Sequence, residues 1–286
     1  MSTTLELTSA EIAGLRLRLE QDGFKIGGLQ HGKFQAREEG VVVNAYKSGK
    51  VVVQGKGEAA FLERYGLSAP VPVLTEPTVG SDESGKGDYF GPLTVCAVAV
   101  RPEQIAELVA AGVRDSKAMG DGVVKRAAVV VRSLCPHAIR VLSPEQYNQR
   151  HEQEKNVALF LATLHAEVIA EVVRACDDLR HVVIDQFTFA ERLEDALGAE
   201  GVNLPVEIRP KAESNPAVAA ASVLARSEFL IALESLGGEH GWELPKGAGT
   251  PVERVAREMF EAGGMKLLHS VAKTHFKTTQ KITGLF

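Results

Sequence analysis

The amino-acid sequence predicts an α/β protein in two parts: a small α+β domain, then a larger domain in which strands and helices alternate. Three prolines within residues 68–77 interrupt any regular element and separate the two patterned regions. Short strand-like runs precede this break, whereas apolar strands and long helices alternate after it. We therefore expect a first domain over residues 1–70, a linker over 71–79 and a second domain over 80–286.

The first domain is expected to open with a helix. Thr8 and Glu11 have the spacing of a capping box, and the helix that they begin would end at Gly23. Three strands are then expected, over residues 33–37, 41–46 and 50–54, with Lys47-Ser48-Gly49 as a hairpin turn. A short helix from Glu58 completes the pattern.

The second domain alternates strands and helices. We expect strands over residues 93–101 and 139–142, a helix from Glu103 and a long helix over 155–175. An apolar β-branched run from His181 then predicts a buried strand that ends in Asp185. A short strand from Val206 stops before a long helix that Pro216 can open. His165, beside leucines in the helix over 155–175, is expected to be a half-buried structural histidine.

Composition limits the classes of function. The chain has 286 residues, of which 45% are hydrophobic and 24% charged, enough for one sizeable domain and a small one. A formal net charge of −5 is not that of a general nucleic-acid binder, so contacts with a polyanion must rest on local charge. Residues 23–66 contain seven Lys or Arg against four Glu, and residues 266–286 contain four Lys and no acid.

Cysteines and apolar runs suggest the compartment. The three cysteines are widely spaced and lie in or beside apolar segments, which predicts core residues in a reducing environment rather than disulfides or a zinc site. No N-terminal segment resembles a signal peptide, and no apolar run approaches the length of a membrane span. We expect a cytoplasmic protein that does not contact a membrane.

The most informative segment is Asp82-Glu83-Ser84-Gly85-Lys86-Gly87-Asp88. Together with Gly80 it fits the start of a P-loop, but Gly87 stands where that motif needs a hydroxyl to hold magnesium. Asp82 and Glu83 would also repel a triphosphate. These carboxylates make sense if they bind hard cations that in turn bind phosphate, as in two-metal phosphodiester hydrolysis.

Such a site needs about four acidic side chains. Asp185 at the end of its strand is one further candidate, and Glu213 at the following strand-to-helix junction is another. One geometric difficulty remains, because adjacent residues of a regular strand point to opposite faces. For Asp82 and Glu83 to serve one site, the strand is expected to end or bulge there, or Glu83 to contribute its backbone carbonyl as well.

At these residues the chain resembles the type 2 ribonucleases H, and most closely ribonuclease HIII. The resemblance covers nearly the whole chain through five pieces in order: residues 82–92, Asp115-Ser116-Lys117, the strand ending at Asp185, residues 211–222, and Pro245-Lys246-Gly247-Ala248 with the tail 273–277. It implies a ribonuclease H-like catalytic domain with a mixed sheet flanked by helices, preceded by a small TATA-box-binding-protein-like domain. Glutamate at position 213 and lysine within Gly85-Lys86-Gly87 favour the HIII branch over HII.

The resemblance also implies an activity and its residues. The catalytic and metal-binding quartet would be Asp82, Glu83, Asp185 and Glu213, holding two Mg²⁺ or Mn²⁺ ions during catalysis. The substrate would be the RNA strand of an RNA/DNA hybrid, cut to 5′-phosphate and 3′-hydroxyl ends. Further substrate contacts are expected from Ser84, Gly85, Lys86, Gly87, Ser116, Lys117 and Ser222. Because a protein tells RNA from DNA only at the 2′-hydroxyl, the glycines would let backbone groups approach it.

The small domain would add a sequence-independent grip. Lys33, Arg37, Lys47 and Lys50 on or near its sheet could contact the phosphates of the hybrid, although these cations could equally form a solvated face. Two other activities stay open: incision at a single ribonucleotide in DNA, as in ribonuclease HII, and binding of hybrids without cleavage. No obligate protein partner is inferred, and a monomer is expected.

Overall fold

The computed structural model describes residues 2–67, 74–113, 116 and 119–284. The chain forms two compact units, Met1–Val71 and Pro72–Phe286, each with its own core. Strand β6 begins at Thr78, so the last two residues of the predicted 71–79 linker belong to the second unit's sheet instead. Residues 71–73 of that linker lie outside the described part.

The first unit is a five-stranded antiparallel sheet with two helices. Its elements are β1 (Ser2–Glu6), α1 (Ser9–Gln21), β2 (Lys25–Gly27), β3 (Gly32–Glu38), β4 (Val41–Tyr46), β5 (Lys50–Gln54) and α2 (Glu58–Arg64). The order in the sheet is β1-β5-β4-β3-β2. The predicted capping box is present, since Thr8 Oγ1 accepts from the Glu11 N–H and the Glu11 carboxylate accepts from the Thr8 N–H. The expected strands and helices are found, and β1 and β2 are additional.

Alternation along these strands separates a core face from an open face. Inward residues such as Phe34, Val43 and Val53 pack with Ile12 of α1 and Phe61 of α2 in one cluster. Phe34 is only 2% exposed, so its ring belongs to the core.

The second unit contains the remaining elements. They are β6 (Thr78–Ser84), β7 (Leu93–Val100), η1 (Pro102–Gln104), α3 (Ile105–Ala110), α4 (Asp121–Leu134), β8 (His137–Leu142), α5 (Pro144–Glu154), α6 (Val157–Ala175), β9 (His181–Asp185), α7 (Ala190–Ala199), β10 (Val206–Arg209), η3 (Ala212–Ser214), α8 (Pro216–His240), α9 (Thr250–Val271) and α10 (Lys277–Thr283). The helix expected over 155–175 is shorter at its start, because Lys155 adopts a left-handed conformation (φ 51°) and Asn156 caps α6 afresh.

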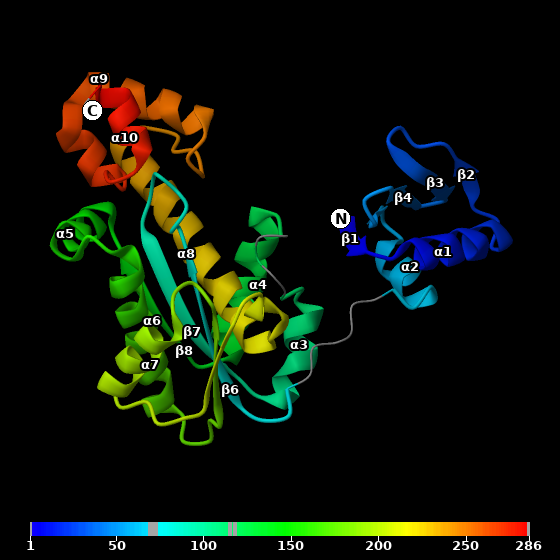
Figure 1. Cartoon of the computed structure of the whole chain (residues 1–286), viewed down its shortest axis with the longest axis horizontal. Coiled ribbons are helices and arrows are strands. Elements are labelled where there is room, and N and C mark those ends of the chain that lie inside the picture. The colour runs from blue at the N-terminus through cyan, green and yellow to red at the C-terminus, as the bar shows by residue number, and fades with distance from the viewer. Residues whose placement is uncertain (1, 68–73, 114–115, 117–118, 285–286) are drawn as a thin grey trace. The chain divides into compact units, whose positions relative to one another are not determined.

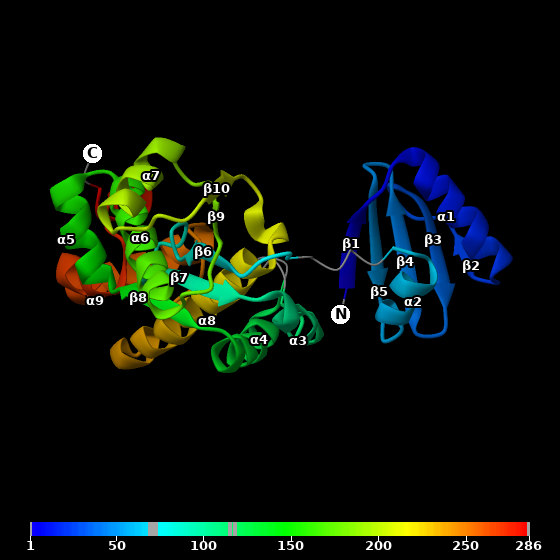
Figure 2. The same cartoon turned by 90° about the horizontal axis from the view of Figure 1, so that it is seen from below.

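The sheet of this unit is mixed, with the order β10-β9-β6-β7-β8. Strand β6 pairs antiparallel with β7 and parallel with β9, so β6 and β9 end at the same edge. Alternate residues of β7 enter different cores: Val95 and Ala97 pack in the cluster that contains α6, whereas Cys96 and Val98 pack in the one that contains α8. The sheet therefore lies between two helical layers (Figures 1 and 2), as the predicted fold class requires.

Helix α8 approaches the sheet closely over Gly80. A Cβ atom at Gly80 would overlap the backbone at Val218 and lie 2.7 Å from the Ala217 carbonyl oxygen, so only glycine fits. Among the described helices, α8 by itself is long and apolar enough to cross a membrane, and 78% of its apolar window is buried inside the protein. A buried core helix accounts for that composition.

Candidate active site

A cleft of about 260 Å³ opens at the edge where β6 and β9 end. The parallel pairing of these strands reaches Ser81 opposite Ile184, so Asp82 and Asp185 are the next residues on neighbouring strands. The cleft is lined by Asp82, Glu83, Ser84, Gly85, Lys86, Gly87, Asp88, Ser116, Asp185 and Arg226. Three acids of the predicted quartet and the whole predicted Ser84–Gly87 segment thus meet in one place, although Asp185 is distant in sequence from the contiguous residues 82–87.

Asp82 and Glu83 reach this cleft from opposite faces of a regular strand. Their pairing with Cys96 and Val95 of β7 continues without a bulge through Ser84, so the expected bend is absent there. The chain turns only at Gly85, where φ is +87°. Asp82 is 6% exposed, and its Oδ1 accepts the Glu83 backbone N–H at 2.8 Å. Because β6 extends past the end of its pairing with β9, side chains from both faces can reach the same opening.

Two basic side chains contact the Glu83 carboxylate. His165 Nε2 lies 3.3 Å from Oε2, and Lys86 Nζ lies 3.3 Å from Oε1. Burial alone would raise the pKa of Glu83, but the His165 ring and the Lys86 ammonium outweigh it and lower this pKa below its ordinary value. Glu83 is therefore ionised at neutral pH, as a cation ligand must be.

His165 is fully buried on α6, where the sequence predicted a half-buried histidine. The Ser81 hydroxyl has one proton, which it donates to the Cys96 carbonyl at 2.8 Å. The same hydroxyl lies 2.7 Å from His165 Nδ1, a contact that turns the other ring nitrogen, Nε2, towards Glu83. The contact with Ser81 fixes the position of this histidine. Sequence alone could not predict it, because it joins two elements that are far apart in the chain.

The other two predicted acids, Asp185 and Glu213, are connected through one hydrogen bond to the backbone. Asp185 Oδ1 accepts the Ala212 N–H at 3.0 Å, and Glu213 is the next residue, within η3. Glu213 does not line the cleft, so the expectation that all four acids share one pocket is met by three. The described residues contain no group of three or more His, Cys, Asp or Glu side chains arranged to hold a metal ion. The physical reason is that Asp82, Glu83 and Asp185 each turn to donors within the protein.

The donor chemistry nevertheless fits a hard divalent cation. Carboxylate oxygens are the ligands that Mg²⁺ and Mn²⁺ prefer, and three carboxylates converge here without a thiolate.

Helix α8 and the segment before α4 form the opposite wall. Ser116 Oγ is 2.8 Å from Ser222 Oγ, and both are buried. Ser222 therefore supports Ser116, which lines the cleft, rather than facing the cleft itself. Lys117 lies outside the described residues.

Arg226 is a cleft residue that the sequence reasoning missed. It follows Ser222 by one helical turn, and that i, i+4 spacing beside the predicted Ser222 could have indicated it. Its guanidinium donates to Asp121 Oδ1 at 3.1 Å, and its buried Nε has no hydrogen-bond partner among the described residues. Arg226 therefore adds a fixed positive charge to the lining of an acidic cleft.

The loop that follows β6 is held down by the C-terminal segment. Lys273 Nζ donates to the carbonyls of Asp88 (3.0 Å) and Gly91 (2.6 Å), and the Asp88 carboxylate accepts the Gly247 N–H at 2.6 Å. Lys273 is fully buried, and burial lowers its pKa to about 7. It is therefore not part of the surface excess of lysine expected over residues 266–286, but an anchor of the glycine loop.

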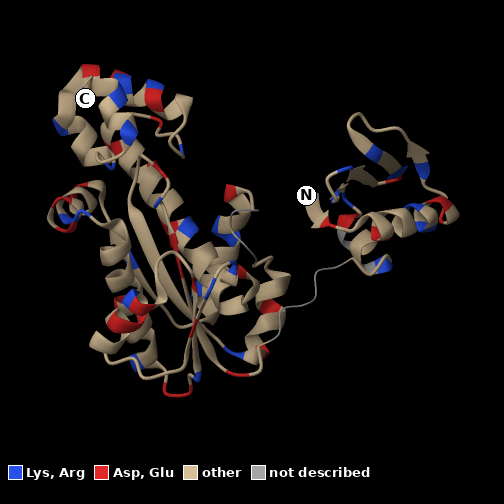
Figure 3. Cartoon of the chain, viewed as in Figure 1, with Lys and Arg blue, Asp and Glu red and all other residues tan. Residues whose placement is uncertain are grey.

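The predicted basic residues of the first unit differ in their surroundings. Lys33 lies at a β-bulge and donates to Ser9 Oγ at 2.9 Å, and Arg37 donates to Gln35 at 2.7 Å. Lys47 and Lys50 are exposed at and just after the β4–β5 turn. Basic and acidic residues are interspersed over both units (Figure 3). Lys33 is thus tied to the start of α1, whereas the other three are accessible.

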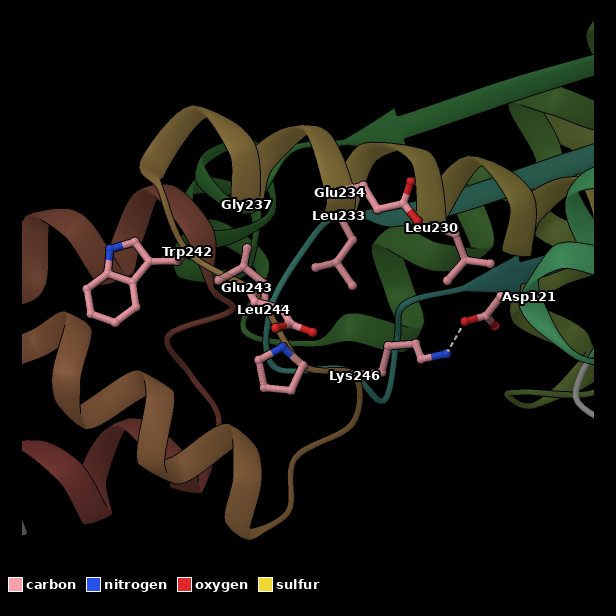
Figure 4. Close-up of a pocket in the computed structure, with 10 residues that line it drawn as sticks. Asp121, Leu230, Leu233, Glu234, Gly237, Trp242, Glu243, Leu244 and Lys246 are labelled. Carbon is pink, nitrogen blue, oxygen red and sulfur yellow. Dashed lines mark hydrogen bonds and ion pairs between the residues drawn. The ribbon is translucent and has the colours of Figure 1, made fainter.

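A second groove, of about 410 Å³, lies along α8 beside the segment 242–246 (Figure 4). Leu230, Leu233 and Trp242 line it, and Lys246 closes one end through a 2.6 Å bond to Asp121. Asp121 also binds Arg226, so this aspartate joins the groove to the active-site wall.

Comparison with known proteins decides the family. A family model described as Ribonuclease HII matches residues 79–279, and one described as a domain of unknown function (DUF3378) matches residues 3–74. Ribonuclease HIII of Protochlamydia amoebophila (strain UWE25) is 36% identical over 99% of this chain and 96% of its own length. The chain belongs to the ribonuclease HIII family. Ribonuclease HIII of Chlamydia felis (strain Fe/C-56), also 36% identical, covers 99% of this chain and 98% of its own.

Solved structures agree. The structure of Bst-RNase HIII in complex with Mn²⁺ matches with a TM-score of 0.71 and 32% identity, covering 100% of this chain and 99% of that one. The ribonuclease HII in the PCNA:RNase HII complex from Archaeoglobus fulgidus has a TM-score of 0.61 and 29% identity, and it covers 72% of this chain and 96% of its own. The predicted fold and family are confirmed, and the chain is a ribonuclease H enzyme.

Proposed function

We propose that this protein is a divalent-cation-dependent endonuclease that hydrolyses the RNA strand of RNA/DNA hybrids and leaves 5′-phosphate and 3′-hydroxyl ends. The observation that carries the proposal is the convergence of Asp82, Glu83 and Asp185 in one cleft beside the Gly85–Gly87 backbone. Membership of the ribonuclease HIII family and a relative's complex with Mn²⁺ support it.

Asp82, Glu83, Asp185 and Glu213 would hold Mg²⁺ or Mn²⁺. Two such ions, when bound, supply activation of the attacking water and charge stabilisation at the leaving 3′-oxygen. The protein's own contribution is to keep these carboxylates ionised and oriented. The Glu83 N–H and the Ala212 N–H fix Asp82 and Asp185 through hydrogen bonds, and His165 and Lys86 lower the pKa of Glu83.

The glycine loop would select ribose. Gly87 has free space around its α-carbon, so its backbone can approach a 2′-hydroxyl closely. Lys86 and Arg226 place positive charge on two sides of the cleft, where they would contact phosphates without reading sequence. Ser116, supported by Ser222, lines the same wall.

The first unit would add affinity through Arg37, Lys47 and Lys50, which contact phosphates of the same duplex. We further propose that the enzyme is cytoplasmic and acts as a monomer without an obligate protein partner.

Asp185→Asn tests the proposal, because it removes a cation ligand but keeps the hydrogen bond with Ala212. We expect the wild type to cut a labelled hybrid with Mg²⁺ or Mn²⁺ and to stop cutting when chelator is added. The Asp185→Asn variant should bind the hybrid but not cleave it. Equal binding with no cleavage by either protein would favour a binding protein instead. Efficient cutting of a DNA duplex with one ribonucleotide, and not of a hybrid with several, would favour the ribonuclease HII-like activity.

A further inference from the structure

A buried histidine contacts the cleft although it is not one of its acids. The His165 ring is held on three sides: Ser81 at Nδ1, Glu83 at Nε2, and the Phe187 ring stacked on it at a centroid distance of 4.7 Å and an interplanar angle of 21°. Nε2 is buried and makes no hydrogen bond among the described residues, although it lies 3.3 Å from Glu83 Oε2. Burying a polar atom without a hydrogen bond costs free energy, so the position of this nitrogen beside Glu83 requires an explanation.

Phe187 connects the histidine with the other side of the site. It follows Asp185 by two residues, and Lys86 Nζ lies 5.2 Å from its ring centroid. Lys86 contacts one oxygen of Glu83 and His165 contacts the other. Both partners of the Glu83 carboxylate therefore rest on the same aromatic ring, which the β9 loop supplies.

We propose that His165 and Phe187 form a support that positions the Glu83 carboxylate for cation binding, with His165 a positioning residue rather than a catalytic one. The inference rests on the proposed function. Its physical reason is the strand geometry: Asp82 leaves β6 on the α8 face, whereas Glu83 leaves it on the α6 face and must be directed back towards the edge. A free glutamate side chain loses rotamer entropy when it is fixed, and a preformed support removes that cost from cation binding.

The test uses two support variants, His165→Gln and Phe187→Leu, and a control, His137→Gln. His137 lies in the same unit at the start of β8, and its Nδ1 is 2.8 Å from the Cys135 carbonyl oxygen, away from the cleft. Mn²⁺ affinity is measured by electron paramagnetic resonance without nucleic acid, and kcat and KM are measured on a hybrid, all at one pH. Thermal unfolding checks the fold of each variant.

We expect both support variants to bind Mn²⁺ about 10- to 100-fold more weakly, which is the usual effect of replacing a group that orients a metal ligand. They should also lose kcat at saturating hybrid with little change in KM. The control should match the wild type. Wild-type Mn²⁺ affinity and kcat in a folded Phe187→Leu variant would overturn the inference, even if His165→Gln fails to fold. A wild type that neither binds Mn²⁺ nor cleaves the hybrid would instead overturn the proposed function.

Discussion

Two glycines of the active-site loop should respond to alanine in opposite ways. Gly85 has φ +87°, and a Cβ there would overlap the Pro92 carbonyl oxygen and lie 2.8 Å from Cδ2 of Phe229. The left-handed conformation costs an alanine about 1–2 kcal/mol, and the overlap adds about 1–3 kcal/mol. We therefore expect Gly85→Ala to lower the free energy of unfolding by about 2–5 kcal/mol.

At about 2–4 °C per kcal/mol for a domain of this size, the melting temperature should fall by about 4–20 °C. Gly87 is the matched comparison, because nothing lies within 4 Å of its added Cβ. Gly87→Ala should melt like the wild type but cleave hybrid about fivefold less efficiently, since one backbone contact with the ribose is worth about 1 kcal/mol.

Differential scanning calorimetry and hybrid cleavage kinetics separate the two effects. A Gly85→Ala protein as stable as the wild type would refute the packing argument. A Gly87→Ala protein with full activity would refute close backbone approach to the substrate at that position.

Three further outcomes are expected. An ordinary lysine has a pKa of about 10.4, and burial lowers that of Lys273 to about 7, so between these values the unfolded chain binds a proton that the folded protein has lost. The free energy of unfolding, measured by urea titration, should therefore rise from pH 7 to 9, and this rise should be missing in Lys273→Met. The same dependence on pH in both proteins would contradict the lowered pKa of Lys273. Arg226→Ala should raise KM for hybrid and reduce the salt slope of binding by about 1. Lys125→Ala is the control and should do neither, because Lys125 is paired with Glu234 outside the cleft. A change confined to kcat would argue against a phosphate contact. Replacing Arg37 and Lys50 together by alanine should weaken hybrid binding at low salt and leave Mn²⁺ affinity unchanged. If the variant and the wild type bind hybrid equally well throughout a salt titration, these two residues do not contact its phosphates.

The sequence predicted those parts of the fold that depend on local chemistry. The capping box at Thr8, the strand that ends in Asp185 and the helix opened by Pro216 all occur as expected, because each depends on neighbours within a few residues. The break at Lys155 was not predictable, since a non-glycine residue there adopts a left-handed conformation that the chain composition does not signal.

The candidate site divides in the same way. Asp185 could be found because it ends a recognisable apolar strand, and Asp82 because it stands with Glu83 beside Gly85-Lys86-Gly87. His165 and Arg226 could not, because their roles depend on which face of α6 and α8 meets the sheet, and that is set by tertiary packing.

Topology explains why the site lies at this edge of the sheet. Strand β6 is the only described strand that has a parallel neighbour on one side and an antiparallel one on the other. Its end therefore meets the end of β9, which brings Asp185, and also the loop that returns to β7, which brings the glycines. Lys273 holds that loop through two of its carbonyls, and the Asp88–Gly247 and Gly91–Val271 hydrogen bonds hold it as well. The proposed cation ligands and the glycine loop that we propose reads ribose are thus fixed against each other by one strand and these bonds, so loosening Lys273 should disturb substrate selection before it disturbs cation binding.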